Sequence, residues 1–421
     1  MARRDGRAAG RLRGIDAARA IAIVGMVMVH VGPREGAGLG FTLYGLTYGR
    51  ASLLFVVLAG VGVSLLAGDG GRSRVRDARL RLLFRAAVLF PLGLWLQTLD
   101  TPVAVILHYY AVYFLIAATA VRLPDRALAT AAVVLAVVGP LVSIASEQLV
   151  PGWWEGDIAA TLREPGRLLR ELLLTGYYPA LTWAPPLLAG MWVGHRDLRA
   201  PRVQRALLAG GGGVAAFAYV GAWALGRVVV GGAPEVDTPG FLVTAGGHTD
   251  MPLGIIGATA VALAVLGAAL LICTRLPRLT WPLAATGQLA LSIYVGHLLV
   301  LHVAPELLVR DGLAGAAFMV ARFAVVTVVG ATLWRAALPR GPLEAVLHAP
   351  WALAGNASTS PSLFIAFQLT LLASMPYRPR YQRGRQRGRR HGRSTDRREH
   401  RRYGGCSRGD GGHRQQRDRH G

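Results

Sequence analysis

Charged residues are scarce in this sequence: they make up 16% of its 421 residues, whereas hydrophobic residues make up 53%. In soluble globular proteins the charged share is close to a quarter. The shortage therefore excludes a soluble globular protein and indicates one that folds in a lipid bilayer. Apolar runs of about 18 to 25 residues recur along the chain, which is the length that a helix needs to cross about 30 Å of hydrocarbon.

Cysteine is almost absent as well, since Cys273 and Cys406 are the only two. One lies in an apolar run and the other in a basic segment near the carboxyl end, so neither a disulfide framework nor a zinc cluster is predicted. The basic amino end resembles the start of a signal peptide but is not followed by a small-residue cleavage site. We expect it to be retained.

The apolar runs predict an all-α, polytopic helical membrane protein with about ten transmembrane helices. Its parts would be a basic cytoplasmic amino end (residues 1–16), a membrane domain (residues 17–348) and an Arg-rich tail (residues 349–421). The predicted spans are 17–33, 48–67, 82–99, 102–121, 128–148, 176–195, 206–230, 252–273, 282–303 and 315–336.

The net charge of +23 is divided between the tail and the short loops that connect the spans. Basic loops would all fall on one side of the membrane: residues 3–19, 72–81, 122–126, 196–205, 275–278 and 335–340. The loops on the other side hold Glu155, Asp157, Glu235, Asp237, Asp250, Glu306 and Asp311, with Arg163, Arg167 and Arg170 as the main exceptions. Because positively charged loops stay in the cytoplasm, we predict that both termini are cytoplasmic and that the protein lies in the plasma membrane.

The tail has a different composition from the rest of the chain. Residues 376–421 contain sixteen Arg, no Lys and only four acidic residues, and such a segment has no means of forming a core. We expect it to be disordered. An Arg-rich segment suits contact with anionic lipid, but a shifted reading frame would produce the same composition. Nucleic-acid binding by the main domain is not expected.

Ionisable residues within the spans are few, and such residues are costly in a bilayer unless they serve a function. His30 lies near the outer end of the first span, His108 in the fourth, and His297 and His302 in the ninth. A histidine can act as a general base near neutral pH, although one bonded to a helix carbonyl is equally ordinary. Arg19 precedes His30 by eleven residues, about 16 Å along a helix, on nearly the same face.

Several segments together resemble a known family. The segment RLRGIDAARAIAIVGMVMVH (Arg11 to His30) is similar to the first-helix signature of bacterial type 3 membrane acyltransferases and of relatives of heparan-alpha-glucosaminide N-acetyltransferase, in which Asp, Arg and His follow in this order. Further similarity lies in GRASLLFVVLAGVGVSLL (residues 49–66), YYPALTWAPPLLAGMWVGHR (residues 177–196), GQLALSIYVGHLLVLH (residues 287–302) and GPLEAVLH (residues 341–348).

The resemblance implies transfer of an acyl group from cytoplasmic acyl-CoA to an acceptor on the outer side, often a sugar. Acetyl is the acyl group that we expect first. It implies that His30 and Arg19 are the essential pair. Arg13 and Arg19 would bind the CoA phosphates. In one respect the sequence departs from the resemblance: the lysosomal enzyme carries its active-site histidine just before the second helix, and residues 32–48 contain none.

Other polar residues are predicted to help bind the acceptor or stabilise charge in the reaction. Arg50, at the outer start of the second span, matches an Arg of the bacterial group, and His297 and His248 are further candidates for substrate binding. Asp250 lies beside His248 in the sequence. Tyr109, Tyr110, Tyr294 or His297 would donate to a developing oxyanion, although tyrosines between helices more often serve packing. Arg50 also suits an interaction with lipid headgroups.

Two other functions fit the composition. A transporter or flippase of a small or lipid-linked anionic molecule would also have about ten spans and a few buried histidines, but no inverted repeat is visible. The second alternative is a non-catalytic membrane scaffold whose basic tail recruits partners. The sequence leaves direct transfer and an acyl-histidine intermediate equally open.

Overall fold

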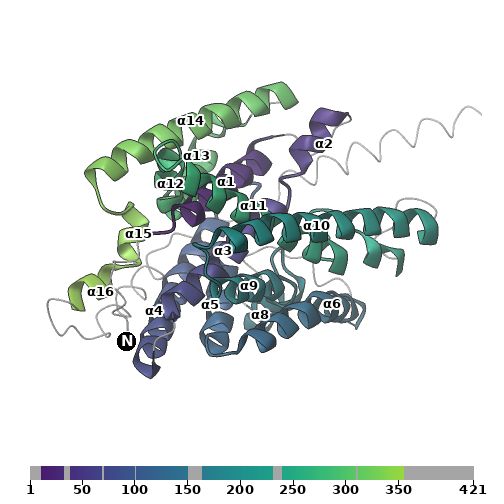
Figure 1. Cartoon of the computed structure of the whole chain (residues 1–421). Helices are drawn as coiled ribbons and strands as arrows, with labels where there is room; N and C mark the ends of the chain where they lie inside the picture. The colour runs from purple at the N-terminus through teal and green to yellow at the C-terminus, as the bar shows by residue number, and fades with distance from the viewer. Residues whose placement is uncertain are drawn as a thin grey trace, which may run out of the picture. The chain divides into compact units, whose positions relative to one another are not determined.

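The computed structural model describes residues 11–32, 38–68, 71–99, 101–149, 164–230, 239–309 and 312–354. These ranges contain helices and connecting loops and no strand, which confirms the predicted all-α class. The longer helices are α1 (Arg13–Val31), α3 (Arg50–Ala67), α4 (Arg72–Gln97), α5 (Leu107–Ala120), α6 (Asp125–Leu149), α9 (Ala180–Gly194), α10 (Pro201–Leu225), α11 (Pro252–Arg275), α13 (Ala290–Val303) and α14 (Leu313–Ala337) (Figure 1).

Short helices and single turns connect them. They are α2 (Leu39–Gly45), α8 (Pro165–Arg170), α12 (Trp281–Gln288), α15 (Pro342–Val346), α16 (Ala349–Ala354), the π-helical turns η1 (Glu171–Thr175) and η2 (Gly226–Val230), and the 3₁₀ turns η3 (Pro239–Val243) and η4 (Pro305–Leu307). Proline lies in the first turn of α8, α10, α11, α12 and α15. The backbone N–H groups of a first turn have no partner within the helix, so proline, which lacks an N–H, costs no hydrogen bond there.

Among the described residues, seven helical segments are long and apolar enough to cross a membrane. α12 and α13 meet at a bend of 70° and make an eighth span if they are counted together. α5 and α9, with 14 and 15 residues, are shorter than a straight crossing requires. Each of the ten predicted segments thus contains a helix, and the multispan membrane fold is confirmed. The count of ten spans and the cytoplasmic position of both termini stay predictions.

The start of α5 shows why hydropathy alone overestimates its length. Residues 101–105 are not helical, although they continue the apolar run. The side chain of Gln97 on α4 accepts a hydrogen bond from the amide of Val105 at 2.8 Å. A non-helical backbone survives at membrane depth only where protein groups satisfy it. Gln97 supplies one such partner.

Burial separates central from peripheral helices. Most of α1 and α3 is buried inside the protein, whereas only about a fifth of α6, α10 and α14 is. The exposed side chains of α10 and α14 are large and apolar, among them Phe217, Val220, Phe318, Val325 and Leu333. Exposed apolar surface of this extent fits contact with lipid tails and not with water. α1 and α3 therefore form the centre of the membrane domain.

Glycine allows α3 and α9 to cross closely. A Cβ atom at Gly60 would overlap the carbonyl oxygen of Leu187, and one at Gly190 would overlap that of Val57. Small residues at such crossings are typical of helix pairs in membranes. Gly211 on α10 serves close packing as well, since its Cβ would lie 2.6 Å from the carbonyl oxygen of Ala260 on α11.

The GPLEAVLH segment (residues 341–348) caps the start of α13 with hydrogen bonds. Glu344 on α15 accepts hydrogen bonds from the amides of Leu291 and Ser292 at 2.9 and 3.1 Å, and from the hydroxyl of Ser292. The first amides of a helix have no partner within the helix, and a carboxylate is favourable at this end. Glu344 therefore stabilises the break between α12 and α13.

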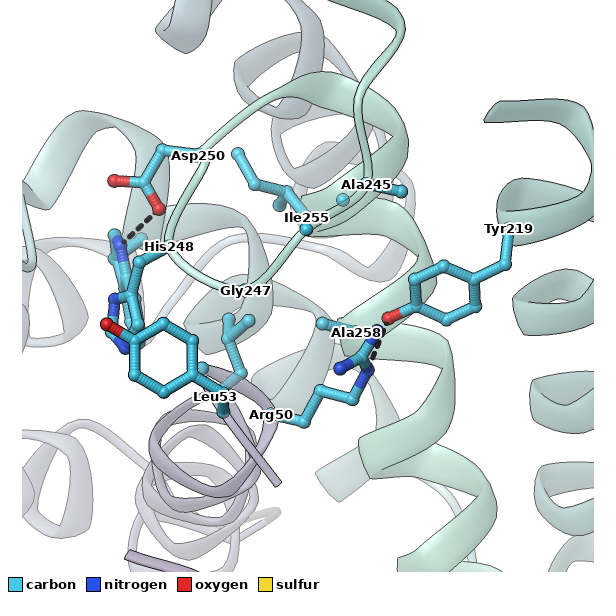
Figure 2. Close-up of a pocket in the computed structure, with 14 residues that line it drawn as sticks. Arg50, Leu53, Tyr219, Ala245, Gly247, His248, Asp250, Ile255 and Ala258 are labelled. Carbon is cyan, nitrogen blue, oxygen red and sulfur yellow. Dashed lines mark hydrogen bonds between the residues drawn. The ribbon is translucent and has the colours of Figure 1, made fainter. Parts of the chain in front are cut away.

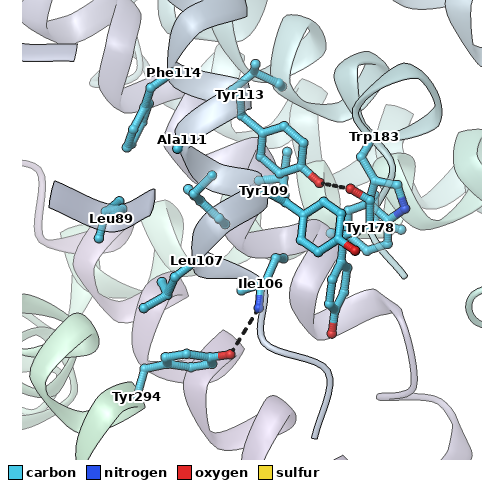
Figure 3. Packing of buried hydrophobic residues seen from close by; sticks show 14 of the residues in the cluster. Leu89, Ile106, Leu107, Tyr109, Ala111, Tyr113, Phe114, Tyr178, Trp183 and Tyr294 are labelled. Carbon is cyan, nitrogen blue, oxygen red and sulfur yellow. Dashed lines mark hydrogen bonds between the residues drawn. The ribbon is translucent and has the colours of Figure 1, made fainter. Parts of the chain in front are cut away.

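Aromatic residues fill the centre of the largest hydrophobic core (Figure 3). The hydroxyl of Tyr113 donates to the carbonyl of Tyr178 at 2.7 Å, and the amide of Ile106 donates to the hydroxyl of Tyr294 at 3.3 Å. These bonds tie α5 to α13 and to the segment before α9. The basic amino end up to residue 10, and the tail from residue 355 with its Cys406, lie outside the described residues.

Candidate functional site

Two histidines from distant parts of the chain meet inside the membrane domain. His30, on the last turn of α1, and His297, on α13, are joined by a hydrogen bond of 3.0 Å between Nδ1 of His30 and Nε2 of His297. The ring planes are 5° from parallel and the centroids lie 5.3 Å apart, as expected for two imidazoles joined edge to edge by this bond. His297 is buried, with 2% of its surface exposed. The sequence predicted both residues but not their contact.

The hydrogen bonds of the pair assign the ring protons. Nδ1 of His297 lies 3.4 Å from the carbonyl oxygen of Ile293, and a carbonyl can only accept, so this nitrogen carries the proton. Neutral His297 then has its lone pair on Nε2, and Nδ1 of His30 must donate to it. In this tautomer a neutral His30 would carry its lone pair on Nε2 and could accept a proton there.

At the other end of α1, a buried carboxylate binds two guanidinium groups. Asp16 has 1% of its surface exposed and accepts hydrogen bonds from Arg11 and, at 2.8 Å, from Arg19. Gln288 donates to it at 3.2 Å and accepts from Arg335 on α14 at 2.7 Å. The cluster thus joins α1, α12 and α14, and a Cβ atom at Gly287 would overlap the carbonyl oxygen of Asp16.

Positive charge exceeds negative charge around Arg19. Arg85 on α4 is close enough to Arg19 to repel it electrostatically, and the guanidinium of Arg19 lies 3.5 Å from the position that a Cβ of Gly62 would take. Because α1 is one unbroken helix, Arg19 and His30 are about 16 Å apart along its axis, as predicted. Arg13 does not join this cluster but donates to the carbonyl of Pro277 at 3.0 Å.

A third group of predicted residues meets at the start of α3. Arg50, His248 and Asp250 line one pocket together with Tyr48 and Tyr219 (Figure 2). Arg50 donates to the hydroxyl of Tyr219 at 2.8 Å, and its guanidinium lies 4.7 Å from the centre of that ring. The cavity measures about 10 Å³, which is room for one water molecule. Binding of an acceptor by Arg50 and His248 therefore stays a prediction that requires the pocket to open.

His248 lies against the residues that precede α3. A Cβ at Gly49 would lie 3.0 Å from the amide nitrogen of His248, so the structure places a histidine next to the position where the resemblance expects one, but from another loop. The imidazole is surrounded by the rings of Tyr48, Tyr177, Tyr178 and Trp183, with centroids 4.5 to 5.8 Å away. Among the described residues, its Nδ1 has no hydrogen-bond partner.

Asp250 links this loop to the start of α9 by hydrogen bonds, which the sequence did not indicate. It accepts hydrogen bonds from Trp183 Nε1 at 3.0 Å and from the Thr182 hydroxyl at 3.4 Å. Asp250 and His248 both have a positive φ, 54° and 58°, which is uncommon for residues other than glycine. Backbone strain of this kind persists where surrounding contacts hold it, often at functional sites. No sequence pattern signals these backbone angles.

Burial shifts the pKa values of these two loop residues in opposite senses. It raises the pKa of Asp250 to about 7, although the hydrogen bonds from Trp183 and Thr182 act against this. It lowers the pKa of His248 to about 4. Asp250 thus contributes stability that is present at low pH and is lost as the pH rises through about 7. His248 contributes stability that is present above about 6.5 and is lost as the pH falls towards 4.

We expect Asp250→Asn to isolate the first of these effects. The melting temperature of the wild type relative to this variant should fall between about pH 4 and about pH 7, because in that range the carboxyl group is ionised in the unfolded chain but still protonated in the folded protein. Thermal unfolding in detergent at a series of pH values measures the difference. Asp77→Asn, at an exposed position, is the control and should not change the profile. Identical pH profiles for the wild type and Asp250→Asn would contradict the prediction.

The remaining predicted groups differ in whether they still have a proton or a ring nitrogen that could form a further hydrogen bond. Tyr109 donates to Glu171 at 3.3 Å, whereas the hydroxyl of Tyr294 accepts from Ile106 and keeps its own proton to donate. The ring of Tyr294 lies 5.2 Å from that of His297. Nδ1 of His108 and the hydroxyl of Tyr110 are buried without a hydrogen-bond partner among the described residues.

The fold and these sites define a multispan helical membrane protein with a buried histidine pair and a guanidinium cluster on its first helix. The chain matches the family model of heparan-alpha-glucosaminide N-acetyltransferase, catalytic, over residues 11–226, and it belongs to this family. Residues 203–352 match a second family, described as protein of unknown function (DUF418). A comparison with curated proteins finds no match. The family match supports a membrane acetyltransferase-like function.

Proposed function

We propose that this protein is a membrane acyltransferase that moves an acyl group from cytoplasmic acyl-CoA to an acceptor on the outer side of the plasma membrane. The acyl group that we expect is acetyl. The acceptor would be a hydroxyl or amine of a sugar or another cell-envelope component. The observation that carries the proposal is the hydrogen-bonded pair of His30 and His297 inside the membrane domain, in which His30 would act as the base through Nε2.

The guanidinium cluster supports binding of the donor at the opposite end of α1. Arg19 and Arg85 repel each other, and Asp16 binds Arg19 and Arg11 together. A group with several negative charges would relieve this excess, and the planar fork of Arg suits phosphate. The basic loops support a cytoplasmic position of this end, where the phosphates of CoA would be held by Arg19 and Arg85, with Arg13 farther out.

In the chemical step, the acceptor oxygen or nitrogen attacks the thioester carbonyl while Nε2 of His30 takes its proton. The new bond joins the acceptor to the acyl carbon. The tetrahedral intermediate then collapses with cleavage of the carbon–sulfur bond, and the leaving thiolate receives the proton from His30. His297 would orient the imidazole, and Tyr294 beside it would donate to the oxyanion.

The test uses the full chain in proteoliposomes that contain a simple amino sugar, such as glucosamine, on one side and receive acetyl-CoA labelled on the acetyl group on the other. We expect labelled sugar and an equal amount of free CoA thiol, and only with the donor on the side of the Arg loops. A series of acyl-CoA donors and of sugar and lipid-linked acceptors extends the assay. Label that crosses the membrane on an unmodified molecule would instead establish a transporter. No transfer with any pair would overturn the proposal.

A further inference from the structure

An apolar groove lies between α6, α9, α10 and α11, and it shares the lining residue Ile255 with the pocket beside His248. Its volume is about 540 Å³, and its lining is almost entirely apolar, with Arg196 and Thr259 as the polar exceptions. Val133 on α6 and Val214 on α10 line it and are 65% and 48% exposed. Because these two helices are peripheral, the groove opens towards the bilayer.

The length of the groove matches one leaflet of the membrane. On α9 the lining extends from Pro185 to Val193 and continues to Arg196 in the turn that follows, and on α10 it extends from Val203 to Val214. The α10 stretch rises by about 16 Å along its helix, and one leaflet contributes about half of a hydrocarbon core of roughly 30 Å. The groove therefore has the length of an extended acyl chain that starts at the surface and ends near the bilayer centre.

Positive charge lies at the surface end of the groove. Arg196 ends the α9 side of the lining, where its guanidinium stacks on Trp192 at 4.8 Å and lies 2.9 Å from Asp125. Three further arginines follow within nine residues: Arg199, Arg202 and Arg205. Deeper in the groove, the hydroxyl of Thr259 is buried and has no partner among the described residues. The charge complements an anionic headgroup.

We propose that this groove binds one acyl chain of a phosphate-bearing lipid from the cytoplasmic leaflet, with the lipid phosphate at Arg196 and its neighbours. The inference uses the predicted orientation of the Arg loops but not the acyltransferase activity. The proposal also explains why a glycine is suitable at position 210. Gly210 lines the groove, and apart from its own stretch of α10 no atom lies within 4 Å of the position that a Cβ would take, so its missing side chain leaves room for the lipid.

Two glycines close together on α10 provide matched variants. A leucine at Gly210 would project into the groove, whereas Gly213 has equally open space but does not line the groove. Leucine has a higher helix propensity than glycine, so both Gly210→Leu and Gly213→Leu should fold. The melting temperatures of both variants verify this.

The probe is a phosphatidylglycerol with a photoactivatable group on its acyl chain, in nanodiscs of phosphatidylcholine. We expect cross-links to peptides of α10 and α11 that line the groove. These should fall about tenfold in Gly210→Leu and remain in Gly213→Leu. Arg196→Gln should reduce the preference for this probe over a phosphatidylcholine probe with the same chain. In the wild type, excess unlabelled phosphatidylglycerol should compete better than phosphatidylcholine.

Equal labelling of the two leucine variants would overturn the proposal, as would equal labelling of the wild type by the two probes. A second copy of the chain in the groove would give a concentration-dependent dimer without lipid adducts, and it would overturn the proposal too. The competition experiment needs no variant, so it decides the outcome even where a substitution impairs folding.

Discussion

Replacement of His30 by alanine is expected to reduce the rate of acyl transfer by about 10²- to 10⁴-fold, the range over which a positioned general base contributes to catalysis. The fold should remain intact, because His30 lies at the last turn of α1 and its hydrogen bond joins one side chain to another. The measurement is the initial rate of labelled transfer in proteoliposomes with equal amounts of folded protein.

Two other histidines make this test specific. His302 lies on α13, five residues after His297, and its side chain is exposed. His302→Ala should therefore retain the wild-type rate. His297→Ala should lower the rate less than His30→Ala and change the pH–rate profile, because His30 would lose the partner that fixes its tautomer.

The same assay decides between His30 and the histidine near α3. If His30 is the base, His248→Ala should weaken binding of the acceptor but keep most of the rate at saturating acceptor. A rate close to that of the wild type in His30→Ala, together with loss of activity in His248→Ala, would contradict the proposed role of His30 while leaving an acyltransferase in place. Loss of the folded protein in His30→Ala would contradict the expectation that the pair is not needed for the fold.

Replacement of Asp16 by alanine is expected to destabilise the protein by about 3–5 kcal/mol, the typical cost of breaking a buried ion pair by removing one partner. Asp16 is 1% exposed, and the side chain of Arg19 is 28% exposed. Without the carboxylate, Arg19 would face Arg85 without compensation, and Gln288 would lose its link to α1. Thermal unfolding in detergent, followed by size-exclusion chromatography, measures the effect.

A solvent-exposed ion pair provides the control. Asp125 binds His195 and Arg196, and its side chain is 40% exposed. Such pairs contribute at most about 1 kcal/mol, so Asp125→Ala should hardly change the melting temperature. Asp16→Asn should be milder than Asp16→Ala, because the amide oxygen still accepts a hydrogen bond from Arg19. Equal melting temperatures for Asp16→Ala and Asp125→Ala would show that the cluster does not stabilise the fold.

The helices of the membrane domain could be predicted from the sequence because their cause is local. A segment that crosses hydrocarbon must be apolar over about 20 residues and must satisfy its own backbone hydrogen bonds. All ten predicted segments contain helices for this reason. The shortness of α5 could not be predicted, because it depends on Gln97, a residue of another helix that binds the amide of Val105.

The positions of the candidate site residues in the fold could be predicted only in part. The spacing of Asp16, Arg19 and His30 follows from a single helix, and the structure keeps them on α1. The contact of His30 with His297, 267 residues away, does not follow from any local pattern. Neither does the approach of His248 to Gly49, since the loop before α11 reaches α3 only through the packing of other helices.

The membrane class, the positions of the helices and the charged and histidine positions of the first helix each depend on the composition of one segment, so they can be predicted from the chain directly. Which polar groups meet depends on how the helices pack: Asp16 contacts Gln288, His30 contacts His297, and Glu344 contacts the start of α13. These contacts join residues that are far apart in the chain. In a bilayer, buried polar groups must find partners on neighbouring helices, so helix packing selects the pairs.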